Sequence, residues 1–133
     1  MIVDASVWVS GLITQDAHHL ASRQWLQEQV RSAHTMVVPT IALPEVAGAI
    51  ARRTGIPALG HRATTLLRRT PGLRLAAIDD TLGARSARIA ADYRLRGADA
   101  TYVALADSLG LELVTWDEDL HRRARSLVSV SYP

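Results

Sequence analysis

The chain opens with MIVDAS, residues 1–6. The apolar residues of this stretch predict a short buried strand that ends at an acid, Asp4. The same arrangement recurs late in the chain, where Asp117 follows the strand-like Glu112–Thr115. In an open α/β sheet, ligands bind outside the carboxyl ends of the strands. We therefore expect Asp4 and Asp117 to meet at one edge of such a sheet.

Between these two segments, strand-like stretches alternate with stretches of helical periodicity. The predicted strands are Met1–Asp4, Thr35–Pro39, Leu73–Ile78, Glu112–Thr115 and Val128–Val130. The predicted helices are Asp16–Ala33, Thr40–Thr54, Ile56–Thr70, Asp80–Arg96, Asp99–Gly110 and Asp117–Ser126, with a short helix or turn at Ser6–Leu12. This alternation predicts an α/β fold with a mainly parallel sheet covered by helices on both faces.

Length and composition indicate one ordinary domain over residues 1–133, because 48% of the residues are hydrophobic and no low-complexity stretch divides them. The chain has no Cys, which excludes disulfides and thiolate metal sites. No apolar run approaches the ~18–20 residues that span a bilayer, so no membrane association is expected. No basic region precedes an apolar stretch at the N-terminus, so no signal peptide is expected. The default prediction is a cytoplasmic protein.

The positive charge is all arginine: the 15 basic residues include no Lys, and the net charge is only +2. Genomic base bias accounts for such a composition, yet Arg also suits bidentate contact with phosphate. Arg94 and Arg96 lie just upstream of Asp99, and Arg52 lies one to two turns beyond Glu45, so these three are candidates for phosphate contact, with a solvated basic face as the simpler interpretation.

Two further acids lie near predicted helix starts. Glu45 falls in the first turns of its helix, with small residues at three- and four-residue spacing, so another element can approach it closely. Asp99 follows Gly97 and precedes a helical run. Each acid has a simpler interpretation, because Asp99 can cap its helix and Glu45 can be solvated. Asp4 and Asp117 can also serve as helix caps.

Together the four acids predict a cation site. Carboxylates gathered at one place repel one another unless a cation binds among them. Hard oxygen ligands of this kind suit Mg²⁺ or Mn²⁺. Asp119 is a further candidate ligand beside Asp117.

Four segments, in order and in spacing, resemble the PIN-domain nucleases, and the likeness is greatest to the VapC toxins of bacterial toxin–antitoxin pairs. The resemblance extends over essentially the whole chain. The segments are Ile2–Trp8, Leu43–Ala47, Gly97–Ala100 and Leu113–Leu120.

The resemblance implies a single α/β/α sandwich that cleaves single-stranded RNA with Mg²⁺ or Mn²⁺. The matching positions make Asp4, Glu45, Asp99 and Asp117 the metal-site acids, with Ser6 and Thr115 as small polar residues beside them. It also implies a homodimer and a cognate antitoxin that blocks the enzyme. The RNA target, whether tRNA, rRNA or mRNA, depends on surface shape and loops.

Other functions fit less well. Asp79-Asp80 looks superficially like the acidic pair of a receiver domain, but receivers and haloacid-dehalogenase-type phosphatases rely on a Lys that this chain lacks. No P-loop and no Gly-x-Ser-x-Gly elbow occur. The five His lack metal-ligand spacing, and the three Trp are expected in the core or an interface, although Trp116 borders the predicted site. A PIN-like module that binds RNA or protein without cutting is the remaining alternative.

Overall fold

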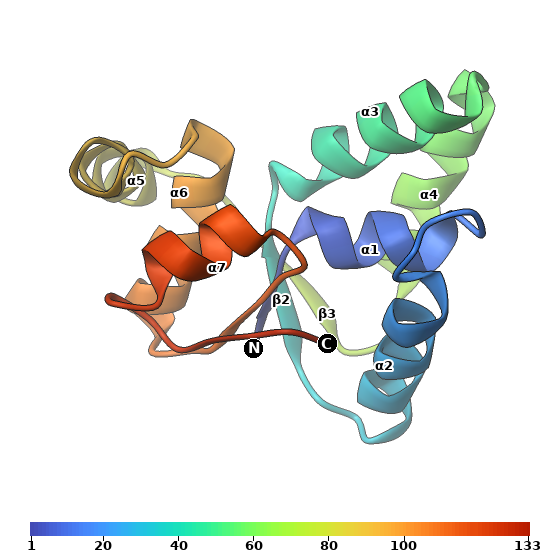
Figure 1. Ribbon diagram of the computed structural model, residues 1–133, viewed down its shortest axis with the longest axis horizontal. Helices are drawn as coiled ribbons and strands as arrows, with labels where there is room; N and C mark the ends of the chain where they lie inside the picture. The colour runs from blue at the N-terminus through green and yellow to red at the C-terminus, as the bar shows by residue number, and fades with distance from the viewer.

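In the computed structural model, which describes residues 1–133, five parallel strands form one sheet (Figure 1). The strand order is β3-β2-β1-β4-β5, and every neighbouring pair is parallel. The bounds are β1 Ile2–Val3, β2 Met36–Pro39, β3 Leu73–Ala76, β4 Leu113–Val114 and β5 Val130–Ser131. The predicted parallel sheet is confirmed.

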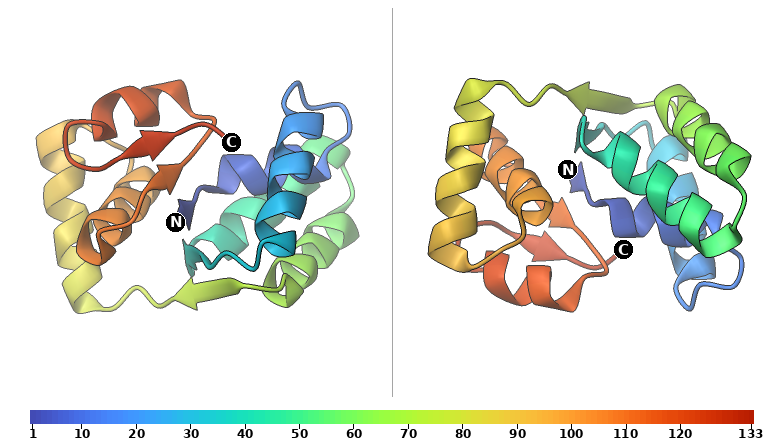
Figure 2. Two further views of the ribbon diagram at one scale, coloured as in Figure 1. Left: turned by 90° about the horizontal axis from the view of Figure 1, so that it is seen from below. Right: turned by 90° about the horizontal axis from the view of Figure 1, so that it is seen from above.

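Seven helices connect the strands, and they lie on the two sides of the sheet (Figure 2). On one side are α1 (Ala5–Leu12), α2 (His19–Arg31), α3 (Ala42–Thr54) and α4 (Pro57–Arg69). On the other side are α5 (Asp80–Tyr93), α6 (Gly97–Leu109) and α7 (Glu118–Ala124). The chain is thus the expected α/β/α sandwich.

This strand order contains a topological switch point. From β1 the chain moves outward to β2 and β3, then crosses the sheet to β4 and β5. The order therefore reverses between the neighbours β1 and β4, and ligands of open α/β sheets bind in the crevice at such a point. The residues that leave β1 and β4 are Asp4 and Thr115. The fold thus places the carboxyl ends of β1 and β4 side by side.

The core is built from the short strands and the helices that cover them. Ile2, Met36 and Leu113 are fully inaccessible in the three central strands. Helix α6 is buried over Ala100–Ala106, and it contacts β1, β2 and β4. A helix that is apolar on all sides must be buried, and this burial fixes the first turn of α6 against the carboxyl ends of the strands.

Helices α3 and α4 pack closely, because a Cβ added to Gly60 would lie 2.5 Å from the carbonyl oxygen of Ala47. Only glycine permits this approach without a shift of the backbone. The close packing supports the whole length of α3, which carries Glu45 in its first turn. No helix in the structure is long and apolar enough to cross a membrane.

Several helix ends differ from the predicted ones, and α6 begins at Gly97 rather than at Asp99; two of the differences have a clear local cause. Helix α2 begins at His19 rather than at Asp16. The Asp16 carboxylate instead accepts the backbone N–H of His18 at 2.9 Å, a local bond that competes with helix formation. Helix α5 ends at Tyr93 rather than at Arg96, because Arg94 adopts the left-handed conformation and Leu95 turns into the core.

Candidate metal and RNA site

Asp4 lies at the centre of the switch point and is 6% exposed. Its Oδ2 accepts hydrogen bonds from the Ser6 hydroxyl at 2.5 Å, the Thr115 hydroxyl at 2.8 Å and the Ser6 backbone N–H at 3.2 Å. Burial raises the pKa of Asp4, and these hydrogen bonds only partly oppose it. Asp4 also caps α1, so it has a structural role whatever else it does.

Ser6 and Thr115, predicted as supporting residues, do more than bind Asp4. The Ser6 Oγ accepts the backbone N–H of Trp116 at 3.1 Å. The Thr115 Oγ1 accepts the backbone N–H of Asp117 at 3.0 Å. The two hydroxyls therefore tie the loop after β4 to the end of β1, which fixes how the acids of the two strands face each other.

Asp117 is the N-cap of α7, and its Oδ1 accepts the backbone N–H of Leu120 at 2.9 Å. The capping interpretation is therefore correct for Asp117, as it is for Asp4, and does not exclude a ligand role, since the second carboxylate oxygen is not used by the cap. Asp119 is exposed and forms ion pairs with Arg122 and Arg123, which hold the pKa of its carboxyl below the ordinary value.

Glu45 lies in the first turn of α3 and is partly buried. Its Oε2 accepts a hydrogen bond from the Tyr102 hydroxyl at 2.8 Å. Burial raises the pKa of Glu45, and the charges of Asp4 and Asp99 raise it further. The side chain is therefore not the solvated Glu of the simpler interpretation. It lies close enough to Asp4 and Asp99 for their charges to act on it.

Asp99 is the third residue of α6, and no capping bond from its side chain is present. Its pKa is raised to about 6, by burial first and then by the charges of Asp4 and Asp117, while Arg96 acts in the opposite direction. A carboxyl whose charged form is disfavoured by its surroundings, without a structural bond, is typical of a functional site.

These four acids come from four separate elements, and each influences at least one of the others electrostatically. We refer to Asp4, Glu45, Asp99 and Asp117 as the acidic edge. As the side chains stand, no group of three or more acidic or His residues is arranged closely enough to hold a metal ion together. The chemistry of the donors nevertheless fits a hard divalent cation, because all are carboxylates and a cation would relieve the charge repulsion that, after burial, raises the pKa values of Glu45 and Asp99.

The three candidate arginines differ in their placement. Arg96 lies close enough to Asp99 and Asp119 to lower the pKa of both carboxyls. The Arg52 guanidinium extends back over Gly48, where an added Cβ would meet its Nη1 at 2.9 Å, one turn from Glu45. Arg94 is exposed at the end of α5.

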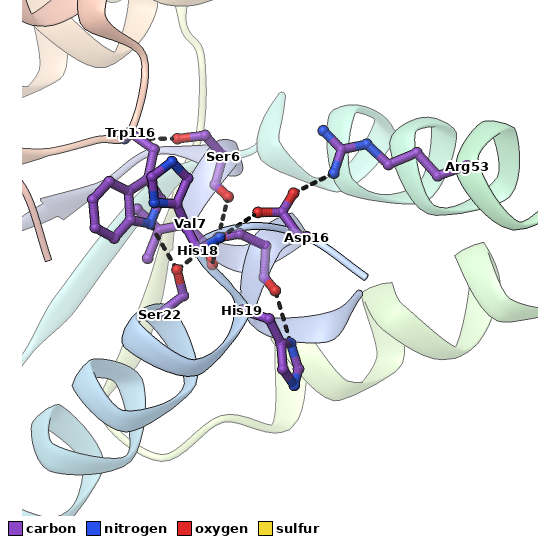
Figure 3. Close-up of polar contacts among 9 residues, drawn as sticks. Ser6, Val7, Asp16, His18, His19, Ser22, Arg53 and Trp116 are labelled. Carbon is purple, nitrogen blue, oxygen red and sulfur yellow. Dashed lines mark hydrogen bonds and ion pairs between the residues drawn. The ribbon is translucent and has the colours of Figure 1, made fainter. Parts of the chain in front are cut away.

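One residue of this region, Tyr102, was missed from the sequence. Tyr102 is fully buried, and burial with the neighbouring carboxylates raises its pKa, so its hydroxyl stays protonated as a donor to Glu45. Its position, three residues after Asp99 on one helix, was the available signal. Trp116 is partly exposed and packs against the core, and it stacks on His18 with ring centroids 4.0 Å apart, while its Nε1 donates to Ser22 (Figure 3).

The fold and the acidic edge define a class: parallel α/β proteins that gather carboxylates at a topological switch point. Residues 1–126 match the sequence model of the PIN domain. The chain therefore belongs to the PIN domain family. No curated protein matches the sequence significantly.

Solved structures with the same fold include three from toxin–antitoxin systems. VapC20 of Mycobacterium tuberculosis, described as a toxin that cleaves the sarcin-ricin loop, has a TM-score of 0.77 at 19% identity over 91% of this chain and 92% of that one. VapBC2 of Rickettsia felis, bound to promoter DNA, has a TM-score of 0.73 at 10% identity over 98% and 96%. A toxin–antitoxin complex from Klebsiella pneumoniae has a TM-score of 0.69 at 17% identity over 98% and 94%.

Proposed function

We propose that this protein is a metal-dependent endoribonuclease that hydrolyses single-stranded RNA in the cytoplasm, as the toxin of a toxin–antitoxin pair. The observation that carries the proposal is the acidic edge: in a PIN domain, carboxylates from four elements converge at the switch point, and three of them have raised pKa values. Such a site is unfavourable in the folded protein without a cation, so its arrangement needs a functional reason.

The four residues of the acidic edge would hold Mg²⁺ or Mn²⁺. A bound divalent cation neutralises charge on the phosphoryl oxygens and makes water a stronger nucleophile at neutral pH. The protein's own groups set the geometry. The hydroxyls of Ser6 and Thr115 fix Asp4, and the Tyr102 hydroxyl fixes Glu45. Second-layer bonds of this kind keep ligands in the orientation that binding requires.

Arginines at the rim of the site would contact the RNA backbone. Arg96 has the strongest support, because its charge acts on Asp99, and the Arg52 guanidinium lies over Gly48, which is one turn from Glu45. Arg94 is the outermost member of this proposed track. Asp119 is already engaged by two arginines, so in this proposal it orients the basic side chains of α7 and is the least suited of the acids to hold metal.

A protein partner is part of the proposal. Toxin–antitoxin complexes are among the structures that share this fold, and they support a separate antitoxin chain that blocks the site. VapC20 is described as cleaving the sarcin-ricin loop, which supports an RNA loop with exposed single-stranded bases as substrate. A homodimer is the expected assembly of the toxin.

The decisive experiment is RNA cleavage by purified protein with Mg²⁺ or Mn²⁺, compared with cleavage in EDTA and by the Asp99→Asn variant. We expect cleavage only by wild-type protein with metal. The products should carry 5′-phosphate and 3′-hydroxyl ends, because water rather than the ribose 2′-oxygen attacks. Products with 2′,3′-cyclic phosphate would overturn the mechanism. RNA binding without cleavage under any metal condition would instead support a non-catalytic PIN-like module.

A further inference from the structure

Four stacked rings lie beside the acidic edge. The His18 and Trp116 ring centroids are 4.0 Å apart with an interplanar angle of 14°. Trp116 and Tyr132 are 5.8 Å apart at 24°, and Tyr132 and His121 are 4.5 Å apart at 6°. We call His18, Trp116, Tyr132 and His121 the ring stack. They come from the loop before α2, the loop after β4, the C-terminal segment and α7.

The ring stack is contiguous with the acidic edge. Trp116 directly precedes Asp117. The Trp116 backbone N–H donates to the Ser6 hydroxyl (Figure 3), and that hydroxyl itself donates to Asp4. A nucleotide bound to the acidic edge through its phosphate therefore has its neighbouring base within reach of these rings.

The stack is held in place by polar contacts that do not involve a ligand. The Trp116 Nε1 donates to the Ser22 hydroxyl at 2.7 Å. Asp16 accepts the His18 backbone N–H and forms an ion pair with Arg53 of α3, which fixes the loop that carries His18 (Figure 3). Fixed rings lose little conformational freedom when a ligand stacks on them, which favours binding.

Two of the four rings, His18 and Tyr132, are exposed, and Trp116 and His121 are partly exposed. Tyr132 is 47% exposed, and His18 is exposed while only Trp116 stacks on it, so no aromatic side chain covers its other face. The nearby cation, Arg53, is paired with Asp16. The local chemistry therefore offers flat apolar faces rather than unpaired positive charge. Such faces suit nucleobases, since every base has a π-face that stacks on aromatic rings.

We propose that the ring stack is a base-stacking platform for the unpaired nucleotides that flank the scissile phosphate. The inference rests on the proposed ribonuclease function and extends it by assigning a base-contacting surface. The platform selects single-stranded over paired RNA, because only unstacked bases can reach it. The platform discriminates little between the four bases, because all of them stack on aromatic rings.

The test is binding of fluorescent oligoadenylate, compared with an abasic oligomer of the same ribose-phosphate backbone. His18→Ala and Tyr132→Ala should each weaken oligoadenylate binding about five-fold or more. Neither should change binding of the abasic oligomer. Tyr132→Ala should leave the salt slope of binding unchanged, because phosphate contacts set that slope. His18→Phe and Tyr132→Phe should restore binding, and His61→Ala, an exposed His on α4, should bind as wild type.

The outcomes separate this inference from the proposed function. If wild-type protein cleaves RNA with metal but both alanine variants bind oligoadenylate normally, the platform is wrong and the ribonuclease stands. Equal weakening of the abasic oligomer, or no oligoadenylate binding by wild type, also overturns the platform. If wild-type protein cleaves no RNA with either metal, the proposed function itself fails.

Discussion

Replacing Asp99 by Asn should stabilise the protein in the absence of metal. The pKa of Asp99 rises from 3.8 to about 6 in the folded protein. With a rise of about two pKa units, the charged Asp99 carboxylate lowers the free energy of unfolding by at most about 3 kcal/mol. Solvent screening of a partly exposed carboxylate and the favourable dipole at the start of α6 reduce this to roughly 1–2 kcal/mol. We expect Asp99→Asn to melt about 3–8 °C above wild type in EDTA near pH 8.

The pH dependence gives the prediction its sign. The pKa of Asp99 is higher in the folded protein than in the unfolded chain, so folding favours the protonated carboxyl. This contribution to stability is fully present below the pKa of the unfolded chain, and it is lost as the pH rises through about 6. The advantage of Asp99→Asn should therefore be absent near pH 4 and should grow as the pH rises to 7. Thermal unfolding followed by circular dichroism across this range measures it.

A matched control is Asp92→Asn, which changes an exposed carboxyl on α5 outside the acidic edge. A surface change of this kind should alter stability by less than about 0.5 kcal/mol at every pH. The reasoning is refuted if Asp99→Asn melts below wild type near pH 8, or if its advantage is as large near pH 4. Adding Mg²⁺ or Mn²⁺ should stabilise wild type more than Asp99→Asn, since a ligand stabilises only the state that binds it.

Three further predictions concern other residues of the site. Asp117→Asn should melt near the wild-type temperature, because Asn also caps a helix, yet it should lose cleavage activity. Asp117→Ala should in addition lose about 1 kcal/mol of stability, because the helix cap is removed. Retained activity in Asp117→Asn would show that the charge of Asp117 is not needed. Tyr102→Phe should lower kcat about 10-fold or more at saturating metal, because the carboxylate that it orients is freed; an unchanged kcat would remove Tyr102 from the site. Changing Arg52, Arg94 or Arg96 to Ala should weaken RNA binding at all sequences and reduce the magnitude of the salt slope by about one unit. If RNA binding and its salt dependence are unchanged in all three variants, the proposed track is excluded.

The fold could be predicted from the sequence because its strands are short apolar runs with a polar residue at the carboxyl end. Asp4 after β1 and Asp117 after β4 illustrate this signal. Helix ends were harder to predict, because single local bonds decide them. The Asp16 carboxylate starts a turn where the periodicity still allowed helix, and Arg94 leaves the helix so that Leu95 can be buried.

The site could be predicted only in part. The four acids can be identified from the sequence by residue type. The hydrogen bonds that orient them cannot, because these bonds join segments that are distant in sequence. The Tyr102 hydroxyl of α6 donates to Glu45 of α3, and these two helices lie on opposite sides of the sheet. The stacking of His18 on Trp116 has no periodic signal at all, because it depends on how a loop before α2 approaches a loop after β4.

The central claim is that carboxylates of the acidic edge form one divalent-cation site. Isothermal titration of wild-type protein with Mn²⁺, set beside the same titration of Asp99→Asn, tests it most directly. Asp99 is the right residue to change, because its side chain makes no capping bond whose loss could disturb the fold. The account predicts saturable Mn²⁺ binding to wild type and affinity at least about 10-fold weaker in the variant. Equal affinity in both proteins, or no binding to wild type, would contradict it.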